Sequence, residues 1–259
     1  MENLVRTIHS AGVDFPAMIP YLKAMKERLH ASIPAKERSS RGITWVVQEM
    51  SRQLVADSRS EEHVRDLAFG INHQLEPRDM LTGVPIFLMA HYGTDHMDEV
   101  LAFFQEAAAS DGWVVREFAA AGFRQLITPN REAVQPWLQG MAGKTDPNLR
   151  RFASETLRPV TALRWLQAEP GYLLKVIGLL FQEPHPYPRT SVGNNLSDLS
   201  RSNPDLILSI VKDLVKSGDS NSYWIACRAC RNLVRQQPMR IMDILQTDEY
   251  HYKDRHYHR

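Results

Sequence analysis

Cysteine is almost absent from this chain of 259 residues, which contains only Cys227 and Cys230. This scarcity argues against a secreted fold held by several disulfides and favours a reducing cytoplasm. The two cysteines form one CxxC inside an apolar helical pattern. Because no second pair accompanies them, we expect no zinc site.

Long hydrophobic runs are also lacking. The longest, VPIFLMA at 84–90 and VIGLLF at 176–181, fall well short of the ~20 residues that a membrane span needs. The initial MENLVRTIHS has no basic segment followed by an apolar one, so we expect no secretory signal. A phosphate-cradling glycine loop and an HExxH motif are missing too, and the sequence therefore predicts a cytoplasmic protein without a cofactor or metal.

Charge is present in both signs but is unevenly distributed. Residues 1–112 carry 11 Lys and Arg against 16 Asp and Glu, a net charge of −5. Residues 113–259 carry 20 against 14, a net charge of +6. The asymmetry indicates a half that faces nucleic acid, or else an accident of surface composition. The hydrophobic fraction of 43% is enough for a sizeable core.

Apolar residues recur at intervals of three and four, and alternating β-branched segments are rare, so the sequence predicts a nearly all-helical protein. A short arginine motif recurs within this pattern, as VRDLA at 64–68, VREFA at 115–119, LRRFA at 149–153 and PRTSV at 188–192. The last two gaps between the motif arginines are 34 and 39 residues. This spacing is typical of two-helix units of HEAT or armadillo size.

Helix-start signals precede several of these units. Asp111-Gly112 precedes VREFA and Asp146-Pro147 precedes LRRFA, where Asp can cap a helix and Pro is suited to its first turn, and Asp219-Ser220 precedes the helix SYWIACRACRNLV. We expect the units to stack into a curved α-solenoid, an all-α fold on whose concave surface equivalent positions of successive repeats lie side by side. The alternative fold is an irregular helical bundle.

We expect a single domain over residues 1–259. Its parts would be divergent helices at 1–110, the recognisable repeats at 111–240 and a flexible tail at 250–259. The tail sequence HYKDRHYHR could touch DNA, but a frayed terminus is the expectation.

One carboxylate lies among three arginines in NLRRFASETLRP (148–159). The buried stripe of this predicted helix consists of Leu149, Phe152, Ala153 and Thr156. Arg151, Glu155 and Arg158 share the adjoining stripe, so an arginine lies one turn from Glu155 on either side. The arginines would favour the charged carboxylate and hold its rotamer. The simplest interpretation is an ion pair on a helix.

The following copy, PRTSVGNNLSDLS, repeats the arrangement with different polar groups. Its apolar stripe is Val192, Leu196 and Leu199, and its polar side is Ser191, Asn194 and Asp198. Aligning the copies by their motif arginines puts Glu155 level with Asn194, with Asp198 one turn further along. Together with Glu117 after the motif arginine of VREFA, three acids are predicted to converge on neighbouring helices.

The segments WVVREFA (113–119), NLRRFASETLRP and YPRTSVGNNLSDLSRSNPDLIL (187–208) resemble the AlkC/AlkD superfamily of DNA alkylation repair glycosylases, and most closely its AlkC branch. The SYWIACRACRNLV helix resembles the family's next repeat. The resemblance covers roughly residues 110–240. It implies HEAT-like repeats that hold duplex DNA and remove alkylated bases such as 3-methyladenine, 7-methylguanine or 3-methylcytosine.

The resemblance also implies the site. Glu117, Glu155 and Asp198 match the family's catalytic acids, and Arg151 and Arg158 match flanking arginines. The chain departs from the family where SEG reads SET, LND reads LSD and VAN reads VGN. The family has a tryptophan just after its RP dipeptide. If Trp165 is its counterpart, it lies two residues further along this chain than in the family.

The implied chemistry explains acids without a histidine partner. An alkylated purine is cationic and leaves readily, so the demand falls on stabilising an oxocarbenium-like sugar and orienting water, as in glycoside hydrolysis. Tryptophans could favour a cationic base, and basic or amide groups could hold phosphates and the lesion. The candidates for DNA and lesion binding are Arg150, Arg151, Arg158, Arg189, Asn194, Trp113, Trp165 and Trp224.

Simpler interpretations exist for the same residues. Asp198 could cap or hydrogen-bond a loop, Glu117 could serve the dipole of its helix, and each tryptophan could belong to the core. The leading hypothesis is a monomeric DNA glycosylase that acts on duplex DNA with alkylated bases in base excision repair. The alternative is a non-catalytic HEAT-like module that binds DNA or a protein.

Overall fold

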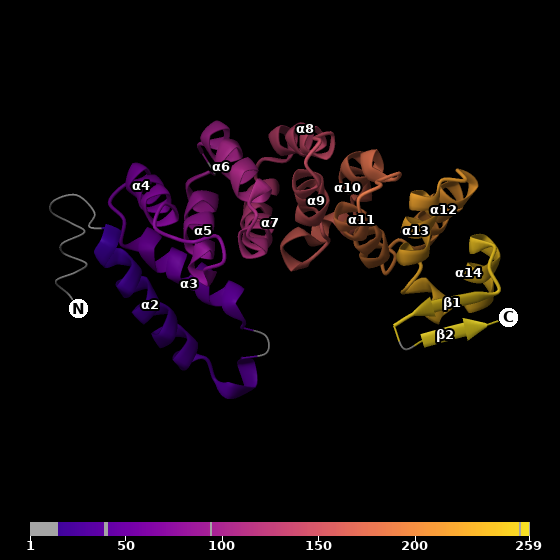
Figure 1. The fold of residues 1–259 in the computed structure, drawn as a ribbon, viewed down its shortest axis with the longest axis horizontal. Coiled ribbons are helices and arrows are strands. Elements are labelled where there is room, and N and C mark those ends of the chain that lie inside the picture. The colour runs from indigo at the N-terminus through magenta and orange to yellow at the C-terminus, as the bar shows by residue number, and fades with distance from the viewer. Residues whose placement is uncertain (1–14, 39–40, 94, 254, 259) are drawn as a thin grey trace. The chain divides into compact units, whose positions relative to one another are not determined.

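The computed structural model describes residues 15–38, 41–93, 95–253 and 255–258, and almost all of their regular structure is helical (Figure 1). The helices fall into two compact units that divide between Pro129 and Asn130. The nearly all-helical fold predicted from the apolar spacing is confirmed. The expected single domain, and its division into divergent helices at 1–110 and recognisable repeats at 111–240, stay predictions.

The first unit contains α2 (Phe15–Ser32), η1 (Ala35–Glu37), α3 (Ile43–Ala56), α4 (Glu61–Asn72), η2 (Met80–Thr82), α5 (Gly83–Tyr92), α6 (Met97–Ala109) and α7 (Trp113–Ile127). Helix α5 is its centre, because it packs against α3, α4, α6 and α7. Every residue from Gly83 to Ala90 is buried. The apolar run VPIFLMA therefore forms a helix that is hydrophobic on all sides, as a fully enclosed helix must be.

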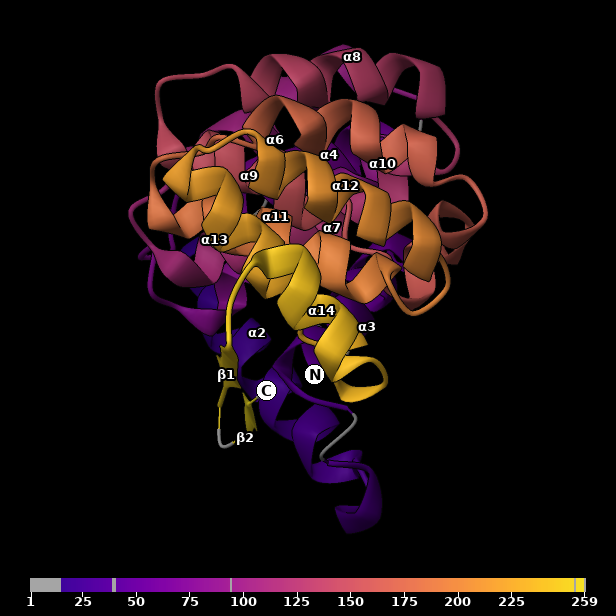
Figure 2. The ribbon, with the colours of Figure 1, turned by 90° about the vertical axis from the view of Figure 1, so that its right-hand side faces the viewer.

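The second unit contains α8 (Arg131–Ala142), α9 (Pro147–Thr156), η3 (Thr161–Gln167), α10 (Pro170–Ile177), η4 (Gly178–Leu180), α11 (Pro186–Leu199), α12 (Pro204–Lys216), α13 (Ser220–Ala229), η5 (Leu233–Arg235) and α14 (Pro238–Leu245). Helices α9, α11 and α13 pack side by side in one layer (Figures 1 and 2). The other layer holds α8 and α10, which pack together, and α12, which packs on α14. This two-layer stacking is the arrangement of HEAT-like repeats.

The predicted buried stripes of α9 and α11 are confirmed. The side chains of Leu149, Phe152, Ala153 and Thr156 are buried, as are those of Val192, Leu196 and Leu199. Most of the predicted helix starts are confirmed as well. Asp146 accepts a hydrogen bond from the Asn148 amide at 2.8 Å, and Asp219 accepts one from the Ser222 amide at 2.7 Å.

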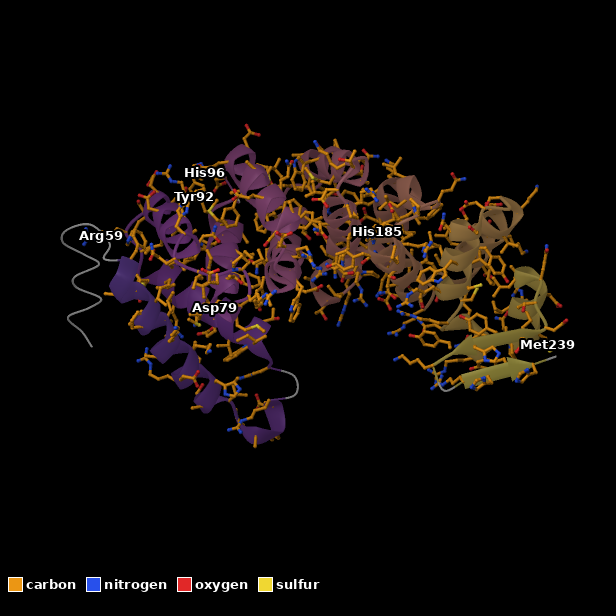
Figure 3. All side chains as sticks on the ribbon, in the orientation of Figure 1. Arg59, Asp79, Tyr92, His96, His185 and Met239 are labelled. Carbon is orange, nitrogen blue, oxygen red and sulfur yellow. The ribbon has the colours of Figure 1, made fainter. Side chains whose placement is uncertain are left out.

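Helix α7 begins differently from the prediction. Its N-cap is Gly112, which has no side chain to accept a bond, and the Ser110 hydroxyl accepts a hydrogen bond from the Gly112 amide at 3.2 Å. The expected Asp111 cap is therefore wrong. The N-cap of α11 is His185, labelled in Figure 3. Its Nδ1 accepts a hydrogen bond from the Tyr187 amide at 3.2 Å.

The motif arginine fastens the loop that precedes its own helix. Arg116 Nη1 donates to the carbonyls of Ser110 and Asp111, at 2.6 and 3.0 Å. Arg150 Nη1 donates to the carbonyls five and six residues before it, at 2.7 and 3.0 Å, and Arg189 donates to that of Pro184 at 3.4 Å. In the last three copies of the motif this arginine thus satisfies loop carbonyls at the start of its helix, whereas Arg65 in the first copy pairs with Asp66 at 2.9 Å.

The C-terminal segment is an antiparallel hairpin of β1 (Glu249–Tyr252) and β2 (Arg255–His258). The flexibility expected of the segment 250–259 stays a prediction. Alternation along β1 turns Tyr250 inward, where its side chain is buried and its hydroxyl donates to the Cys227 carbonyl at 2.6 Å. This contact ties the hairpin to α13.

No helix in the described part of the chain is both long and apolar enough to cross a bilayer.

Glu183 links α9 to the loop before α11, and we expect Glu183→Gln to destabilise the fold. Its side chain is 2% exposed and accepts from Arg150 Nε at 2.7 Å. Burial alone would raise the pKa of Glu183, but the hydrogen bonds from Arg150 and the His185 amide outweigh it and lower the pKa. Replacement should reduce the free energy of unfolding at neutral pH by about 2–3 kcal/mol in urea titrations.

The pH dependence follows from the lowered pKa. The stabilisation by Glu183 is complete above its unfolded pKa and is lost as the pH falls through the folded pKa. The difference between wild type and variant should therefore shrink in acid. Glu169→Gln is the control, because the Arg131–Glu169 pair at 3.3 Å is exposed and is worth about 0–1 kcal/mol. Equal effects of the two variants would contradict the prediction.

Candidate functional site

Glu155 lies on the last turn of α9 with 6% of its surface exposed. Its Oε2 accepts a hydrogen bond from Ser191 Oγ on α11 at 2.7 Å. Arg151 Nη2 lies 3.8 Å from the same oxygen, and Arg158 Nη1 lies 3.5 Å from Oε1. The predicted flanking by Arg151 and Arg158 is confirmed, although α9 ends at Thr156 and Arg158 therefore lies in the turn beyond it.

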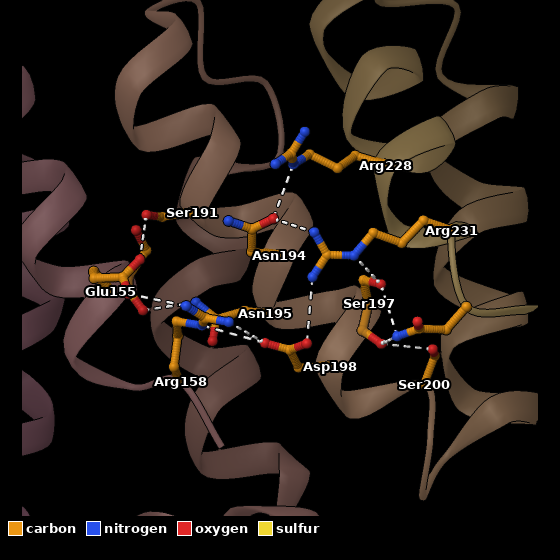
Figure 4. Close-up of polar contacts among 12 residues, drawn as sticks. Glu155, Arg158, Ser191, Asn194, Asn195, Ser197, Asp198, Ser200, Arg228 and Arg231 are labelled. Atoms are coloured by element: carbon orange, nitrogen blue, oxygen red, sulfur yellow. Dashed lines mark hydrogen bonds and ion pairs between the residues drawn. The ribbon is translucent and has the colours of Figure 1, made fainter. Parts of the chain in front are cut away.

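Arg158 connects Glu155 to Asp198 on α11. Its Nη2 and Nε donate to Asp198 Oδ2 at 2.7 and 3.2 Å (Figure 4). Burial by itself would lower the pKa of Arg158, but the hydrogen bond to Asp198 and the charge of Glu155 raise it overall. The guanidinium group thus keeps two carboxylates from neighbouring helices together without mutual repulsion.

Asp198 has a second arginine on its other side. Arg231, just beyond α13, donates from Nη2 to Asp198 Oδ1 at 3.3 Å and from Nε to Ser197 Oγ at 2.7 Å. Its Nη1 donates to Asn194 Oδ1 at 2.7 Å, an oxygen that also accepts from Arg228 Nε at 2.9 Å. One connected network therefore runs from α9 through α11 to α13 (Figure 4).

The acid–arginine cluster, which we define as Arg151, Glu155, Arg158, Asp198, Arg228 and Arg231, carries a formal charge of +2 from four arginines and two carboxylates. Arg228 has no carboxylate within ion-pair distance among the described residues. Burial, and then the charge of Arg231, lower its pKa. A surplus of positive charge at one place is suited to a polyanion such as a nucleic acid backbone.

Gly193 explains how Arg228 reaches the cluster. A Cβ at this position of α11 would lie 2.9 Å from Cβ and Cδ of Arg228 on α13. The glycine therefore lets the Arg228 side chain lie directly against α11. The departure of this chain from the family's VAN to VGN is a local packing feature at the arginine.

The two candidates from the first unit lie on α7. Glu117 is exposed, and Trp113 is 59% exposed at the first position of the helix. Trp113 is thus not a core residue. The convergence of Glu117 with the other two acids stays a prediction, whereas the proximity of Glu155 and Asp198 is confirmed by their shared partner Arg158.

The rings of Trp165 and Trp224 already hold guanidinium groups. Arg131 lies over the Trp165 ring at 3.7 Å from its centroid, and Tyr172 packs edge-on at 5.0 Å. Arg189 and Arg228 lie over the Trp224 ring at 5.0 and 5.4 Å. Contact of either ring with a cationic base stays a prediction. Arg150 and Arg189 hold loops, a role that the sequence interpretation did not assign.

Three functional candidates were missed by the sequence interpretation: Ser191 as a donor to Glu155, and Arg228 and Arg231 as partners of α11. The spacing CRACR was a usable signal, because residues three apart share a helix face. No group of three or more His, Cys, Asp or Glu in the described ranges is arranged to hold a metal ion. Burial raises the pKa of Cys230 to about 12, so this cysteine stays a neutral thiol.

Comparison with solved structures places this fold among known proteins. AlkD2 from Streptococcus mutans superposes with a TM-score of 0.63 at 21% identity, over 83% of this chain and 98% of that one. The protein smu.31 from Streptococcus mutans UA159 gives 0.57 at 21% identity, over 73% of this chain and 98% of its own. The Pseudomonas fluorescens alkylpurine DNA glycosylase AlkC was solved with DNA containing an abasic site analogue. It gives a TM-score of 0.53 at 18% identity, over 95% of this chain and 69% of its own.

The chain has the AlkC/AlkD fold. Since these proteins are HEAT-like helical solenoids, the predicted all-α solenoid class is confirmed and the irregular bundle is wrong. The superfamily resemblance carried by the sequence motifs is confirmed at the level of the fold.

Comparison of the sequence identifies fewer related proteins than comparison of the structure. No protein-family model matches the chain. The uncharacterised protein YhaZ of Bacillus subtilis (strain 168) is 28% identical over 151 residues, which are 56% of this chain. The match spans only 40% of YhaZ, less than half of that relative.

Ser191→Ala tests whether the hydrogen bond to Glu155 matters. It would remove the hydroxyl donor from a buried carboxylate, and we expect a loss of about 1.5–3 kcal/mol in the free energy of unfolding. The matched control is Thr190→Ala on the same helix, whose hydroxyl bonds only the Pro186 carbonyl and should matter by less than about 0.5 kcal/mol. A Ser191 variant as stable as the control would show that the arginines alone satisfy Glu155.

Proposed function

We propose that this protein is a DNA glycosylase that hydrolyses the N-glycosidic bond of an alkylated, cationic base in duplex DNA and leaves an abasic site. The observation that carries the proposal is the pair of carboxylates, Glu155 and Asp198, held together by Arg158 inside a net-positive cluster. The shared fold with an alkylpurine DNA glycosylase solved on DNA supports the same assignment.

Asp198 is suited to the reacting sugar. Its side chain is 18% exposed, against 8% for Glu155, so it is the carboxylate that an incoming substrate reaches more easily. A cationic base needs little protonation to leave, and the barrier lies in the positive charge that develops on the sugar. A fixed carboxylate beside that sugar stabilises the charge and can orient the attacking water.

Glu155 is suited to holding the arginines in place. Its contacts with Ser191, Arg151 and Arg158 fix the position of Arg158 and, through it, that of Asp198. DNA phosphates compete with Asp198 for Arg158 and Arg231, and such competition would free the carboxylate when the substrate is bound. Glu117 is a proposed third acid from the first unit. The preferred base among 3-methyladenine, 7-methylguanine and 3-methylcytosine is left to experiment.

The same contacts favour one alternative function, a non-catalytic module that binds DNA. Both carboxylates are engaged by arginines, as in a structural ion-pair network, and the altered SET and LSD motifs lie at these positions. Such a module would bind duplex DNA with a strong salt dependence and release no base.

We expect Asp198→Asn to slow base release by ten-fold or more while duplex binding is retained. The asparagine keeps the size of the side chain but removes the charge that stabilises the sugar cation. The assay is release of alkylated base from duplex DNA carrying each of the three lesions, under single-turnover conditions. Glu155→Gln should slow release as well, with a larger loss of thermal stability because Glu155 is more buried.

Asp205→Asn is the matched control, because Asp205 is exposed in the first turn of α12. It should leave the rate of release unchanged. Equal rates for Asp198→Asn and wild type would remove Asp198 from the mechanism. Salt-sensitive duplex binding by wild type without release of any of the three bases would favour the non-catalytic module.

A further inference from the structure

An aromatic pocket of about 240 Å³ lies between α13 and the C-terminal hairpin, entirely within the second unit. Its walls include Tyr223, Trp224, Cys227 and Arg228 from α13 and Tyr250 and Tyr252 from β1. We call this the hairpin pocket. The glycosylase chemistry above makes no use of it.

The walls of the hairpin pocket are held by hydrogen bonds. The Tyr250 hydroxyl donates to the Cys227 carbonyl at 2.6 Å, and the Tyr223 hydroxyl donates to the Leu245 carbonyl at 3.0 Å. Each of these two rings is therefore anchored through its hydroxyl to a backbone carbonyl. Tyr252 is half-buried at the end of β1, and no hydrogen bond engages its hydroxyl among the contacts of the described residues. The cations over its ring, Arg231 and Lys253, lie farther out than the arginines over Trp224, at 5.8 and 5.7 Å against 5.0 and 5.4 Å, so Tyr252 is the wall that a stacked ring reaches most easily.

Positive charge surrounds these rings. Arg231 lies over the Tyr252 ring at 5.8 Å from its centroid, and the Lys253 ammonium lies at 5.7 Å. Arg228 lines the pocket and has only the neutral Asn194 oxygen as an acceptor in the described chain. The carboxylate at the rim, Glu249, contacts His251 at 2.6 Å and offsets one of these positive charges. The surplus charge points to an anionic ligand.

The size of the pocket restricts that ligand. Sites for drug-sized molecules enclose about 300–1,000 Å³, so 240 Å³ is suited to a single ring system. Aromatic walls combined with arginine and lysine are the arrangement by which proteins hold unpaired nucleotides, with the base stacked and the phosphate paired. A sugar or a neutral ring would leave the cations without a partner.

The pocket also adjoins the candidate site. Arg231 contacts both the Tyr252 ring and Asp198, and Asn194 joins Arg231 to Arg228. A DNA strand whose phosphate meets these arginines therefore has its neighbouring nucleotide within reach of the pocket.

We propose that the hairpin pocket binds one unpaired nucleotide of a DNA strand, with the base stacked on Tyr252 and the phosphate held by Arg228 and Lys253. The inference rests on the proposed function only in taking DNA as the partner. A protein with such a pocket would prefer DNA with a disrupted base pair over fully paired DNA. Base release alone does not require this preference.

The test measures binding of undamaged, fluorescein-labelled DNA by anisotropy, so it does not depend on base release. The probes are a fully paired duplex and the same duplex with one unpaired adenine. We expect wild type to bind the second more tightly, and Tyr252→Ala to reduce that preference by about ten-fold or more. Tyr252→Phe should keep it, because the ring remains.

Arg228→Gln should weaken binding of both probes, and Arg240→Gln on α14 is the charge-matched control that should weaken neither. Thermal melting checks that each variant is folded. Free deoxyadenosine monophosphate, added as a competitor, separates the two sources of a nucleotide. Competition by the free nucleotide without any preference for the unpaired adenine would assign the pocket to mononucleotides and overturn the DNA form.

Equal affinity of wild type for both probes, or a preference that survives Tyr252→Ala, would also overturn the inference. The outcomes separate it from the proposed function. Base release without a preference for unpaired DNA would leave the glycosylase standing and remove the pocket's role. A Tyr252-dependent preference without base release would support the pocket's role and count against the glycosylase.

Discussion

The interaction on which the second unit depends is the guanidinium group of Arg158 between two carboxylates. Glu155 on α9 and Asp198 on α11 are both largely withdrawn from water, and side by side they would repel each other. Arg158 supplies the intervening positive charge, and Ser191 and Arg231 complete the shells of the two acids. The contact of α9 with α11 and the chemistry proposed for the site therefore rest on the same charge.

Arginine performs several different tasks in this fold. One arginine in each recognisable repeat fastens the loop before its helix through backbone carbonyls, as Arg116 and Arg150 do. Others cover tryptophan rings, and those of the acid–arginine cluster bind carboxylates or amides. The planar guanidinium group is suited to all of these, because it donates in several directions and stacks on aromatic rings. An excess of arginine over carboxylate within the cluster leaves positive charge for a polyanion.

The engaged state of the carboxylates is compatible with catalysis on DNA. Phosphate is a strong acceptor for arginine, so in the proposed function a bound strand would compete for the arginine partners of Asp198 and free its carboxylate. The rigid helices α9, α11 and α13 keep the acids in position during such an exchange, because their apolar stripes are fully buried. A site built on packed helices is held more precisely than one built on loops.

The sequence by itself determined the local features. Asp146 and Asp219 begin helices because a capping side chain acts within three residues, and the buried stripes of α9 and α11 follow from the helical period. The pairing of Glu155 with its flanking arginines was predictable for the same reason.

Only the tertiary structure decided which faces meet. Asp198 contacts Arg158 and Arg231, which are 40 and 33 residues away, and Tyr250 seats the hairpin on α13 through a carbonyl 23 residues away. Helical periodicity tells which side of a helix a residue occupies. The neighbour across that side is set by the packing of whole helices, and this packing places the acids, the arginines and the hairpin pocket together.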